Sequence, residues 1–599
     1  MYQMVTTLDE LEDMLDVIGE GEAALDFETT AFVPEEGRVR LVQVCNDDGW
    51  WVVDFDQLGG FRSVAHWFAD ARWIVFNAGF EQRWFMGATD DPVTCFDVAL
   101  LRKAVEGGGH FSLAKALLWD FKHEMPKDEQ ASNWGAAELT KSQLDYAADD
   151  ALWTWRLWQL WRGRADDDHM YAFNLLNDMI PPVIEMEGSG LTLDPYRHRL
   201  LVDHWKDLAD DRVERIRELI TEDEVANINS GAQLSDFFCS ILTDEHLDAW
   251  PRTEKTGLLS TANADLKNIG AALFADTPLQ DALTLLSEYK TLTKYVSSFG
   301  DTLITKATMD PDFRVHARYN IAAAKTGRFS SSGPNLQQIP RDRDFFGQRL
   351  SVRQSFIAGP DRQLVSLDYS GIELRVLALL SGDEQLLEDM IDGDVHLEMG
   401  SYMAGRRLDK KVTEDKEVRQ NAKAVSFGIV YGISSLGLSA TLKTNMDRAQ
   451  DLINYWASRY PKAFALRDEA MQQAARDDGY LRVIDGGTIY MGKPSRLSPT
   501  QCANYPVQRA ALSVMARAIV RHHDSVLDMR EAGKDVWMAS TIHDALIDEA
   551  ADRDAQEALV RMKADMVAGY SDIFPGAPVD RLVEGGVGPN WGELEDVEV

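Results

Sequence analysis

The sequence has few cysteines, no long apolar run and little positive charge. Its four cysteines are scattered without any CxxC spacing, which excludes a zinc ribbon and a disulfide framework and predicts reduced, buried thiols. No segment approaches the roughly 20 consecutive apolar residues that a membrane span needs. The N-terminus also lacks a basic region followed by an apolar one, so no secretory signal is predicted. We therefore expect a cytoplasmic protein without a membrane partner.

The excess of acidic residues argues at first against a nucleic-acid partner. The formal net charge is −37, whereas affinity for phosphate comes largely from Lys and Arg. The basic residues are unevenly distributed, however, and residues 314–353 contain eight of them against two acidic ones. The eight are Arg314, Arg318, Lys325, Arg328, Arg341, Arg343, Arg349 and Arg353. Such an island predicts one polyanion-binding cleft on an otherwise acidic protein.

The length of 599 residues is too great for one compact core and predicts several domains. Residues 1–160 alternate short apolar runs with helical patterns, which is typical of an α/β domain. A charged, mostly helical stretch follows over residues 166–310. The remainder mixes strand-like runs such as QLVSLDY and WMASTIHDALIDE with long helices such as 413–432. The pattern predicts two α/β parts joined by a helical one.

Carboxylates gather in three separate N-terminal segments. LDFETT places Asp26 and Glu28 two apart on a predicted strand, so both side chains point to one face. FNAGFEQRWF adds Glu81, and LDYAADDAL adds Tyr146 and Asp150 at i and i+4 of a predicted helix. Four such carboxylates can bind two divalent cations about 4 Å apart for phosphodiester hydrolysis, with the tyrosine orienting the attacking water. Taken singly, each acid could instead be a solvated loop end or a helix cap.

Further carboxylates lie in or next to the strand-like runs of the C-terminal part. In LVSLDYSGIELRVLA, Asp368 ends an apolar strand and Glu373 stands in the apolar segment after it. The run WMASTIHDALIDE presents His543 and Asp544. If the two strands are neighbours, Asp368 and Asp544 meet at one end of a sheet, where metal ions would supply the compensating charge. This predicts a second two-metal site, suited to phosphoryl transfer.

The segment VRQNAKAVSFGIVYG carries two cations and two aromatic residues at a spacing of four. Arg419, Lys423, Phe427 and Tyr431 therefore form one stripe along a helix. The stripe suits a nucleoside triphosphate, with the cations on the phosphates, Phe427 against the sugar and Tyr431 where bases stack. The alternative is an amphipathic helix whose aromatic rings pack and whose cations are solvated.

These segments resemble two families, in the families' own order along nearly the whole chain. The N-terminal motifs, with RLVQVC and SNWGAAELTKSQLDYAADDA, resemble the DEDD exonucleases of the tyrosine subtype, such as ribonuclease D and proofreading domains. AAAKTGRFSSSGPNLQQIP, LDYSGIELR, RQNAKAVSFGIVYG and IHDALIDE resemble the motifs of family A DNA polymerases of the polymerase I and phage type. Shorter blocks such as MEGSGLTLD, GDVHLEMGSYMAG and GVGPNWGE also match.

The resemblance implies a multidomain fold of α/β and α+β parts. A ribonuclease H-like 3′–5′ exonuclease domain is expected over residues 1–165, followed by a right-hand polymerase domain over 166–599. The expected thumb covers about 195–310, the palm about 311–385 and 500–599, and the fingers about 386–499. No 5′ nuclease domain is expected.

The resemblance also implies roles for the matched residues. The expected metal ligands are Asp368 and Asp544 at the polymerase site, and Asp26, Glu28, Glu81 and Asp150 at the exonuclease site, with two Mg²⁺ ions at each and Mn²⁺ as a substitute. Lys423 would bind the triphosphate and protonate pyrophosphate, while Arg419 and His396 would hold its oxygens. Glu373 would block a ribose 2′-hydroxyl, and Phe427 and Tyr431 would complete the nucleotide pocket. Primer and template contacts are expected from Arg328, Asn335, Gln337, Asn504, Gln508 and His543.

Several positions depart from the family pattern. Glu81 stands where the second exonuclease motif usually ends in Asp. Gly371 replaces the usual Gln of motif LDYSGIELR, Ala545 replaces the usual Glu after Asp544, and Thr500 replaces an Arg. The segment DGGTIYMG lacks the usual basic cluster. We expect altered DNA contacts and an altered exonuclease rate, with the metal, triphosphate and sugar contacts intact.

The predicted function is template-directed DNA synthesis with 3′–5′ proofreading, in the manner of a phage replication enzyme. The expected partners are primer–template DNA and deoxynucleoside triphosphates, and a monomer is expected. The alternative is a ribonuclease D-like nuclease whose C-terminal part only binds nucleic acid. The stripe from Arg419 to Tyr431 favours the polymerase, because a binding module needs no triphosphate grip beside two acidic strand ends.

Overall fold

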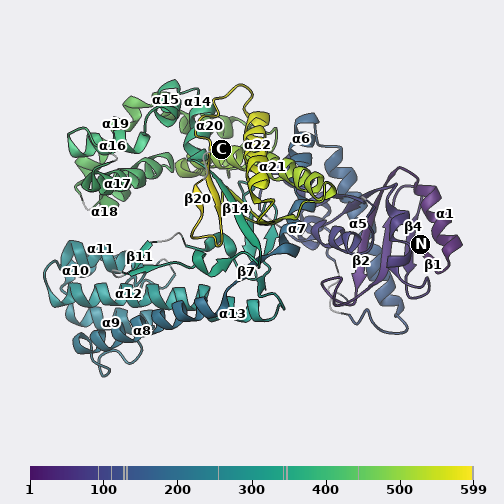
Figure 1. The fold of residues 1–599 in the computed structure, drawn as a ribbon, viewed down its shortest axis with the longest axis horizontal. Helices are drawn as coiled ribbons and strands as arrows, with labels where there is room; N and C mark the ends of the chain where they lie inside the picture. Colours follow the sequence, from purple (N-terminus) through teal and green to yellow (C-terminus); the bar gives the residue numbers. More distant parts are fainter. Residues whose placement is uncertain are drawn as a thin grey trace.

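The computed structural model has an α/β domain at one end and a larger part with two helical lobes at the other (Figure 1). The residues that it describes are 1–596 apart from 92, 110, 126–128, 130–131, 254, 341–342, 346–347, 410 and 443. The N-terminus lies in the α/β domain, and the last described residues form β20 (Glu595–Asp596) in the larger part.

The N-terminal domain contains a six-stranded sheet in the order β1-β4-β3-β2-β5-β6. Its strands are β1 (Gln3–Val5), β2 (Glu22–Thr29), β3 (Val39–Cys45), β4 (Trp50–Asp54), β5 (Arg72–Val75) and β6 (Thr94–Asp97). β2 runs antiparallel to β3 and parallel to β5, so it lies in the middle of a mixed sheet. Every residue of β3 is buried, including the polar residues Arg40 and Gln43.

Five helices belong to this domain: α1 (Leu8–Ile18), α2 (Gly79–Met86), α3 (Val98–Glu106), α4 (Leu113–Phe121) and α5 (Lys141–Arg162). α5 packs against β2 and β3 and buries Trp158 and Trp161. It begins with a capping box, in which Thr140 and Gln143 each accept a hydrogen bond from the other's backbone amide. The box fixes the residue at which α5 begins. It thereby also sets where the acidic residues of α5 lie along the sheet.

Two short helices, α6 (Asp167–Asn177) and α7 (Ile180–Ser189), lead into the first helical lobe. The lobe contains α8 (Pro195–Leu219), α9 (Gly231–Ile241), α10 (Asp244–Ala249), α11 (Asn263–Leu273), α12 (Pro278–Phe299) and α13 (Asp301–Thr308). α8 and α12 pack along each other, and α12 closes an apolar core of its own with the shorter helices. The assignment of about 195–310 to the thumb stays a prediction.

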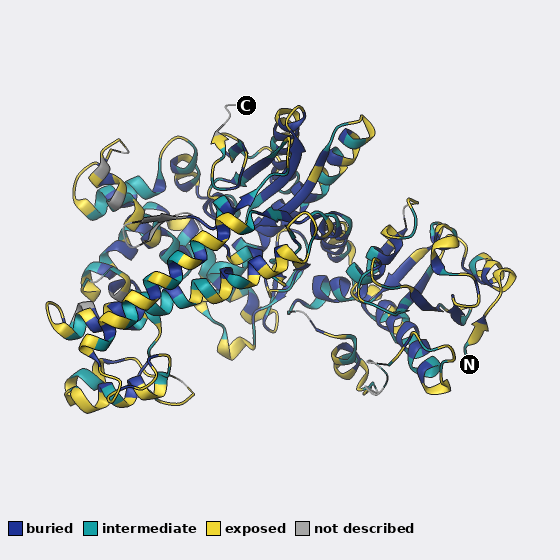
Figure 2. Ribbon diagram, turned by 60° about the horizontal axis from the view of Figure 1, so that its bottom comes forward, coloured by how far each residue is buried: buried dark blue, intermediate teal, exposed yellow. Residues whose placement is uncertain are grey.

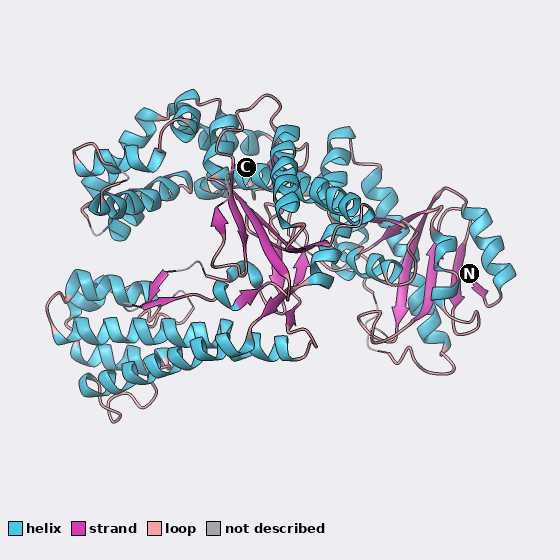
Figure 3. Cartoon of the chain, viewed as in Figure 1, coloured by secondary structure: helices cyan, strands magenta, loops and turns pink. Residues whose placement is uncertain are grey.

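The larger sheet lies between the two helical lobes (Figure 3). It has the order β17-β18-β14-β19-β20, with all neighbours antiparallel. Its main strands are β14 (Arg362–Tyr369), β17 (Val536–Ile542), β18 (Ala545–Ala551) and β19 (Val583–Gly588). Leu364, Val365 and Leu367 of the central strand β14 are buried, and both sheets stand out as dark blue in Figure 2.

The run WMASTIHDALIDE forms two strands, so its prediction as one strand is wrong. β17 ends at Ile542 and β18 begins at Ala545, and these two residues pair across a hairpin. His543 and Asp544 form the turn, where His543 has a φ of 57°, in the left-handed region. The turn carries neither Gly nor Asn nor Pro, so the usual sequence signal of a hairpin is missing.

The second lobe contains α14 (Ile372–Ser381), α15 (Glu384–Ile391), α16 (Val395–Ala404), α17 (Thr413–Val430), α18 (Ser435–Leu442), α19 (Met446–Arg459) and α20 (Pro461–Arg476). α17 confirms the helix expected over 413–432. α21 (Pro499–Glu531) and α22 (Ala555–Ile573) pack on each other, and α22 lies against β14, β18 and β19. The smaller strands are β7 (Leu191–Leu193), β8 (Arg314–Val315), β9 (Arg318–Asn320), β10 (Ser330–Ser332), β11 (Arg343–Phe345), β12 (Gln348–Leu350), β13 (Phe356–Ile357), β15 (Tyr480–Arg482) and β16 (Thr488–Tyr490).

A buried histidine joins α21, α22 and β18. His522 lies between Asp548 at 2.7 Å and Asp565 at 2.9 Å. The two carboxylates outweigh the desolvation of the ring and raise the pKa of His522 to about 10. The imidazolium therefore compensates charge inside the packing of the larger sheet.

Replacing His522 by Gln is expected to lower the free energy of unfolding by about 3–5 kcal/mol at pH 7, because it leaves the Asp548 carboxylate buried without a cation. Since the pKa rises from about 6.5 in the unfolded chain, the stabilisation is complete below that pH and is lost as the pH rises through about 10. Urea unfolding of both proteins at pH 7 and pH 10 measures this. A difference that stays constant between the two pH values would contradict the assignment.

Helices in the described part of the chain all lack the length or the apolar content that a bilayer crossing requires. Cys45, Cys95 and Cys502 are buried free thiols, as expected. Cys239 is exposed, which corrects the expectation for that residue. It lies on α9 of the first helical lobe.

Candidate active sites

Asp26, Glu28 and Asp150 form a compact group of carboxylates at β2. Asp26 and Glu28 share one side of the strand, whereas Phe27 between them is buried on the other. Asp150 comes from α5, which packs against the same strand. One ligand oxygen of each carboxylate lies within 4.8 Å of the other two. The structure thus brings together three of the predicted acids from distant parts of the sequence.

Glu81 and Tyr146 flank this group. Glu81 lies on α2, is 3 % exposed, and has one carboxylate oxygen, Oε2, without a hydrogen-bond partner among the described residues. Burial, and then the negative charge of Asp26, raises the pKa of Glu81. Tyr146 is half-buried and lies one turn before Asp150 on α5. The charge of Asp26 therefore acts on Glu81, but the Glu81 carboxylate is not one of the three mutually close carboxylates.

The carboxylates of this group resist ionisation in the protein alone. Burial raises the pKa of Asp26 to about 7. Burial together with the charges of Asp26 and Asp150 raises the pKa of Glu28 to about 10. Divalent cations would displace the protons and give the free oxygen of Glu81 a partner. The residues therefore fit hard cations with oxygen ligands, such as Mg²⁺.

The second site begins where β14 ends. Asp368 lies opposite Ala545 in the register of β14 and β18. The amide of Tyr369 donates to the carbonyl oxygen of Asp544 at 3.1 Å, so the two aspartates stand on neighbouring chains of the sheet. Both line one cavity of about 770 Å³. Asp368 and Asp544 are therefore close to each other, as the prediction required, although Asp544 lies in a turn and not in a strand.

The stripe on α17 lines the same cavity. Lys423 Nζ lies 5.9 Å from the ring centre of Phe427, whose ring centre is 6.0 Å from that of Tyr431. The ring of His396, from α16, lies 5.6 Å from Phe427. Arg419 completes the cationic end of the stripe. One cavity therefore combines two carboxylates from the sheet with cations and aromatic rings from the helices.

Glu373 is buried at the start of α14 beside this cavity. One carboxylate oxygen accepts a hydrogen bond from the guanidinium of Arg328, and the other accepts one from the hydroxyl of Tyr431. Gly371, just before α14, has a φ of 60°, where a side chain is strained, and a Cβ there would lie 3.0 Å from Met390 Cε. Glycine adopts this backbone conformation without strain.

Asp394 is a site residue that the sequence analysis missed. Its Oδ2 accepts a hydrogen bond from Arg419 Nε at 2.9 Å. Its Oδ1 accepts from the amides of His396 at 3.0 Å and Leu397 at 2.9 Å, which caps α16. The signal was present in GDVHLEMG, where an Asp directly precedes a helical run. Asp394 thereby ties α16 to α17 at the cationic end of the cavity.

Three residues expected to contact DNA lie near the hairpin turn. Gln337 Nε2 donates to the carbonyl of Thr541 at 2.7 Å, and its Oε1 accepts from the amide of His543 at 2.7 Å. His543 itself is exposed. Asn335 is also exposed and accepts from the hydroxyl of Ser331 at 3.2 Å. The structure thus places Gln337 and His543 together, with Asn335 two residues away on the same segment.

Two further expected DNA contacts lie on α21. Asn504 Nδ2 donates to the carbonyl of Tyr431 at 3.4 Å, and Gln508 is half-buried one turn later. Of the cationic segment 314–353, Arg341 and Asp342 lie outside the described residues, as do the side chains of Arg343 and Arg349. The described part of the predicted DNA surface therefore borders the cavity through α21 and the hairpin turn.

The segment DGGTIYMG, which lacks the family's basic cluster, contacts the N-terminal domain. Its strand β16 packs against α3, and the hydroxyl of Thr488 lies 3.1 Å from Nε2 of His169 on α6. A Cβ at Gly107, just after α3, would lie 2.5 Å from the amide nitrogen of Tyr490. These residues therefore serve a contact between domains.

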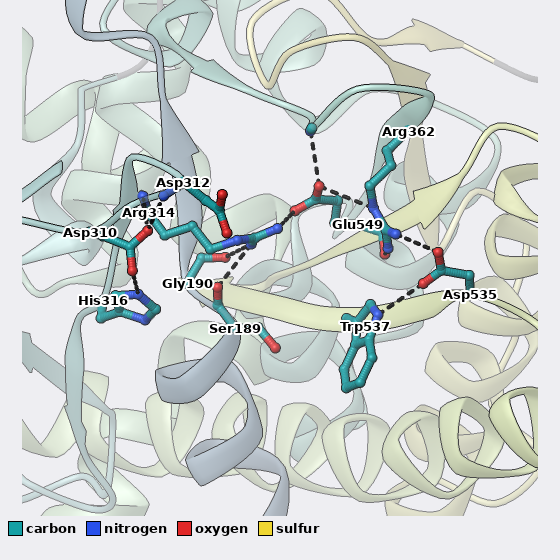
Figure 4. A network of polar contacts seen from close by, with 11 residues as sticks. Ser189, Gly190, Asp310, Asp312, Arg314, His316, Arg362, Asp535, Trp537 and Glu549 are labelled. Carbon is teal, nitrogen blue, oxygen red and sulfur yellow. Dashed lines mark hydrogen bonds and ion pairs between the residues drawn. The ribbon is translucent and has the colours of Figure 1, made fainter. Parts of the chain in front are cut away.

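A buried network anchors β18 to neighbouring segments (Figure 4). Glu549 is 1 % exposed and accepts from Arg314 at 2.8 Å, and Arg362 pairs with it at 3.1 Å. Arg362 also pairs with Asp535 at 2.6 Å, and Arg314 donates to the carbonyl of Ser189 at 2.9 Å. The network joins β14, β18 and the end of α7. Arg314 was counted in the cationic segment, but its guanidinium binds groups of the protein itself.

The chain thus combines an α/β domain that carries clustered carboxylates with a sheet between two helical lobes. Residues 201–593 match the model described as DNA polymerase family A, and residues 2–162 match one described as 3′-5′ exonuclease. The chain belongs to DNA polymerase family A and carries an N-terminal exonuclease domain. The family predicted from the sequence motifs is confirmed.

The relatives are bacterial DNA polymerases. The chain is 32 % identical to DNA polymerase I of Chloroflexus aurantiacus over 471 residues, covering 75 % of this chain and 46 % of that protein. It is 34 % identical to the thermostable DNA polymerase I of Thermus aquaticus over 422 residues, covering 68 % and 46 %. The chain spans about half the length of the curated relatives it matches.

A solved structure shows the same fold. It is the POL domain of Pol1 from M. smegmatis in complex with DNA primer-template and dNTP. The TM-score is 0.79 at 23 % identity, and the match covers 98 % of this chain and 99 % of that chain. The family matches at residues 2–162 and 201–593 confirm the expected order of an exonuclease domain followed by a polymerase domain.

Proposed function

We propose that the chain synthesises DNA on a template and removes nucleotides from the 3′ end of the growing strand. The cavity that holds Asp368 and Asp544 together with Arg419, Lys423 and Phe427 carries the first activity. Carboxylates beside cations and aromatic rings suit a nucleoside triphosphate with its metal ions. A module that only binds nucleic acid has no use for this combination.

The residues of the cavity bind and orient the incoming nucleotide. Lys423 and Arg419 hold triphosphate oxygens by charge-assisted hydrogen bonds, and Lys423 gives a proton to the departing pyrophosphate. Phe427 lies against the sugar. Glu373, held by the hydroxyl of Tyr431, occupies the space that a ribose 2′-hydroxyl would need. This arrangement selects deoxynucleotides by exclusion.

Metal ions complete both sites in this proposal. Asp368 and Asp544 would hold two Mg²⁺ ions at one site, and Asp26, Glu28, Glu81 and Asp150 would hold two at the other. The ions supply positive charge to the transferred or hydrolysed phosphoryl group, and Mn²⁺ can replace Mg²⁺. Tyr146 orients the attacking water at the exonuclease site, where its hydroxyl stays protonated because burial and the neighbouring carboxylates raise its pKa.

DNA contacts are assigned around the cavity. His396 belongs with the triphosphate ligands, and the primer and template contacts are assigned to Arg328, Asn335, Gln337, Asn504, Gln508 and His543. The domain limits at residues 165 and 166 coincide with the segment between α5 and α6. Activity as a monomer and replication of a phage genome stay predictions.

A templated assay tests the proposal. A 5′-labelled primer is annealed to four templates that differ only in the first unpaired base, and each is offered one deoxynucleotide at a time. We expect addition of the complementary nucleotide and little addition of the other three. Equal addition of all four, or none with any template, would contradict template-directed synthesis.

Replacing Phe427 by Tyr is expected to raise incorporation of dideoxynucleotides roughly tenfold or more. The added hydroxyl lies at the sugar and can make the hydrogen bond that the missing 3′-hydroxyl no longer makes, and hydrogen bonds to charged groups contribute about 1.5–3 kcal/mol. The ratio of dideoxynucleotide to deoxynucleotide kcat/KM measures the effect. An unchanged ratio would contradict the placement of this ring against the sugar.

A further inference from the structure

A lysine of the exonuclease domain reaches the polymerase domain. Lys103 lies on α3 and is 4 % exposed. Its ammonium donates to the carbonyl of Gly108 at 2.7 Å and to the carbonyl of Ala324, far along the chain. Burial and the charge of Arg509 lower its pKa to about 7. Burying an ammonium group costs its free energy of hydration. The contacts of Lys103 with the two carbonyl groups therefore indicate a role beyond space filling.

Ala324 closes the short loop that ends in Arg328. Its amide donates to the carbonyl of Arg328 at 3.3 Å, and its carbonyl accepts from the amide of Gly327 at 3.0 Å. The same carbonyl accepts from Lys103. On another side, a Cβ at Gly327 would lie 2.5 Å from NH1 of Arg509 on α21. The loop 324–328 is thus held between the exonuclease domain and α21.

The packing around Lys103 leaves a cavity between the domains. The cavity has a volume of about 230 Å³ and is lined by Lys103, Arg318 and Ala322 among others. The hydrogen bond from Lys103 to the Ala324 carbonyl links the two domains beside this cavity.

The loop delivers Arg328 to the polymerase cavity. The guanidinium of Arg328 lines that cavity with Asp368 and donates to the carboxylate of Glu373. A displacement of Ala324 would be transmitted to Arg328 through the hydrogen bond between their backbones. The path from Lys103 to the cavity therefore consists of three consecutive hydrogen bonds.

We propose that Lys103 is a positioning residue for Arg328, so that the exonuclease domain helps the polymerase site to grip the primer. The inference rests on the proposed polymerase function and on the assignment of Arg328 to the primer. It gives the exonuclease domain a role in synthesis that is separate from its own carboxylate site.

The test replaces Lys103 by Met, which keeps the length of the side chain and removes the donor. We expect the KM for primer–template to rise about threefold to tenfold with kcat changed less than about twofold, as for a residue that acts through another. In an Arg328→Ala background the same replacement is expected to have no further effect. The exposed Lys115→Met variant of the same domain serves as the matched control.

Degradation of a single-stranded oligonucleotide from its 3′ end separates the outcomes. We expect wild-type rates in the Lys103→Met variant. An unchanged KM for primer–template, an equal effect in the Arg328→Ala background, or a parallel loss of single-strand degradation would each overturn the inference. A wild-type protein that extends no primer would overturn the proposed function as well, which distinguishes the two failures.

Discussion

Primer extension is expected to fall at least about a thousandfold when Asp368 is replaced by alanine, while degradation from the 3′ end continues. The carboxylate stands at the end of β14, beside Asp544 and within the cavity that holds the cationic stripe. Without it the metal ions lose a ligand, and metal-assisted phosphoryl transfer loses much of its barrier reduction. The measurement is the single-turnover rate of nucleotide addition.

The matched control is Asp528→Ala, which removes an exposed acid from α21. This variant is expected to extend the primer at the wild-type rate. Affinity for primer–template, measured by fluorescence anisotropy, should change little in the Asp368→Ala variant. Undiminished extension by Asp368→Ala would refute the polymerase site and favour a nuclease with a binding module.

At the N-terminal site the opposite result is expected, with degradation lost and extension retained. Replacing Asp26 and Glu28 by alanine should reduce degradation of a 3′-mismatched primer at least about a thousandfold, with extension of a matched primer retained. Both side chains leave one side of β2 and lie within 4.8 Å of Asp150, so their loss removes two of the three close ligands. The rate of primer shortening without nucleotides measures the effect.

Asp13→Ala, an exposed acid on α1, is the control for this site and should shorten the primer normally. Unchanged degradation in the double variant would mean that these carboxylates do not hydrolyse DNA. Loss of extension along with degradation would mean that the two sites are not independent.

Much of both sites could be predicted from local patterns. The two-residue period placed Asp26 and Glu28 on one side of a strand, and the spacing of four placed Arg419 to Tyr431 along α17. Apolar runs identified β14 as a buried strand. The prediction ended it at Asp368, and the strand runs one residue further, to Tyr369. These features depend on one element each, so short-range periodicity is sufficient to find them.

Features that depend on the meeting of distant segments could not be predicted. Asp394 shows its role only when α16 meets α17. The contact of DGGTIYMG with the N-terminal domain and the reach of Lys103 to Ala324 likewise require the packed domains. The hairpin turn at His543 is local, but it has no glycine to mark it. Family motifs indicated candidate site residues without showing which contacts hold them in place.

The most direct test follows one 5′-labelled primer with a mismatched 3′ end on a longer template, in Mg²⁺, with and without deoxynucleotides. We predict that the wild-type protein shortens the primer when nucleotides are absent. With nucleotides present, we predict removal of the mismatch followed by extension to the end of the template. A primer that keeps its length under both conditions would contradict the presence of two metal-dependent sites on this chain.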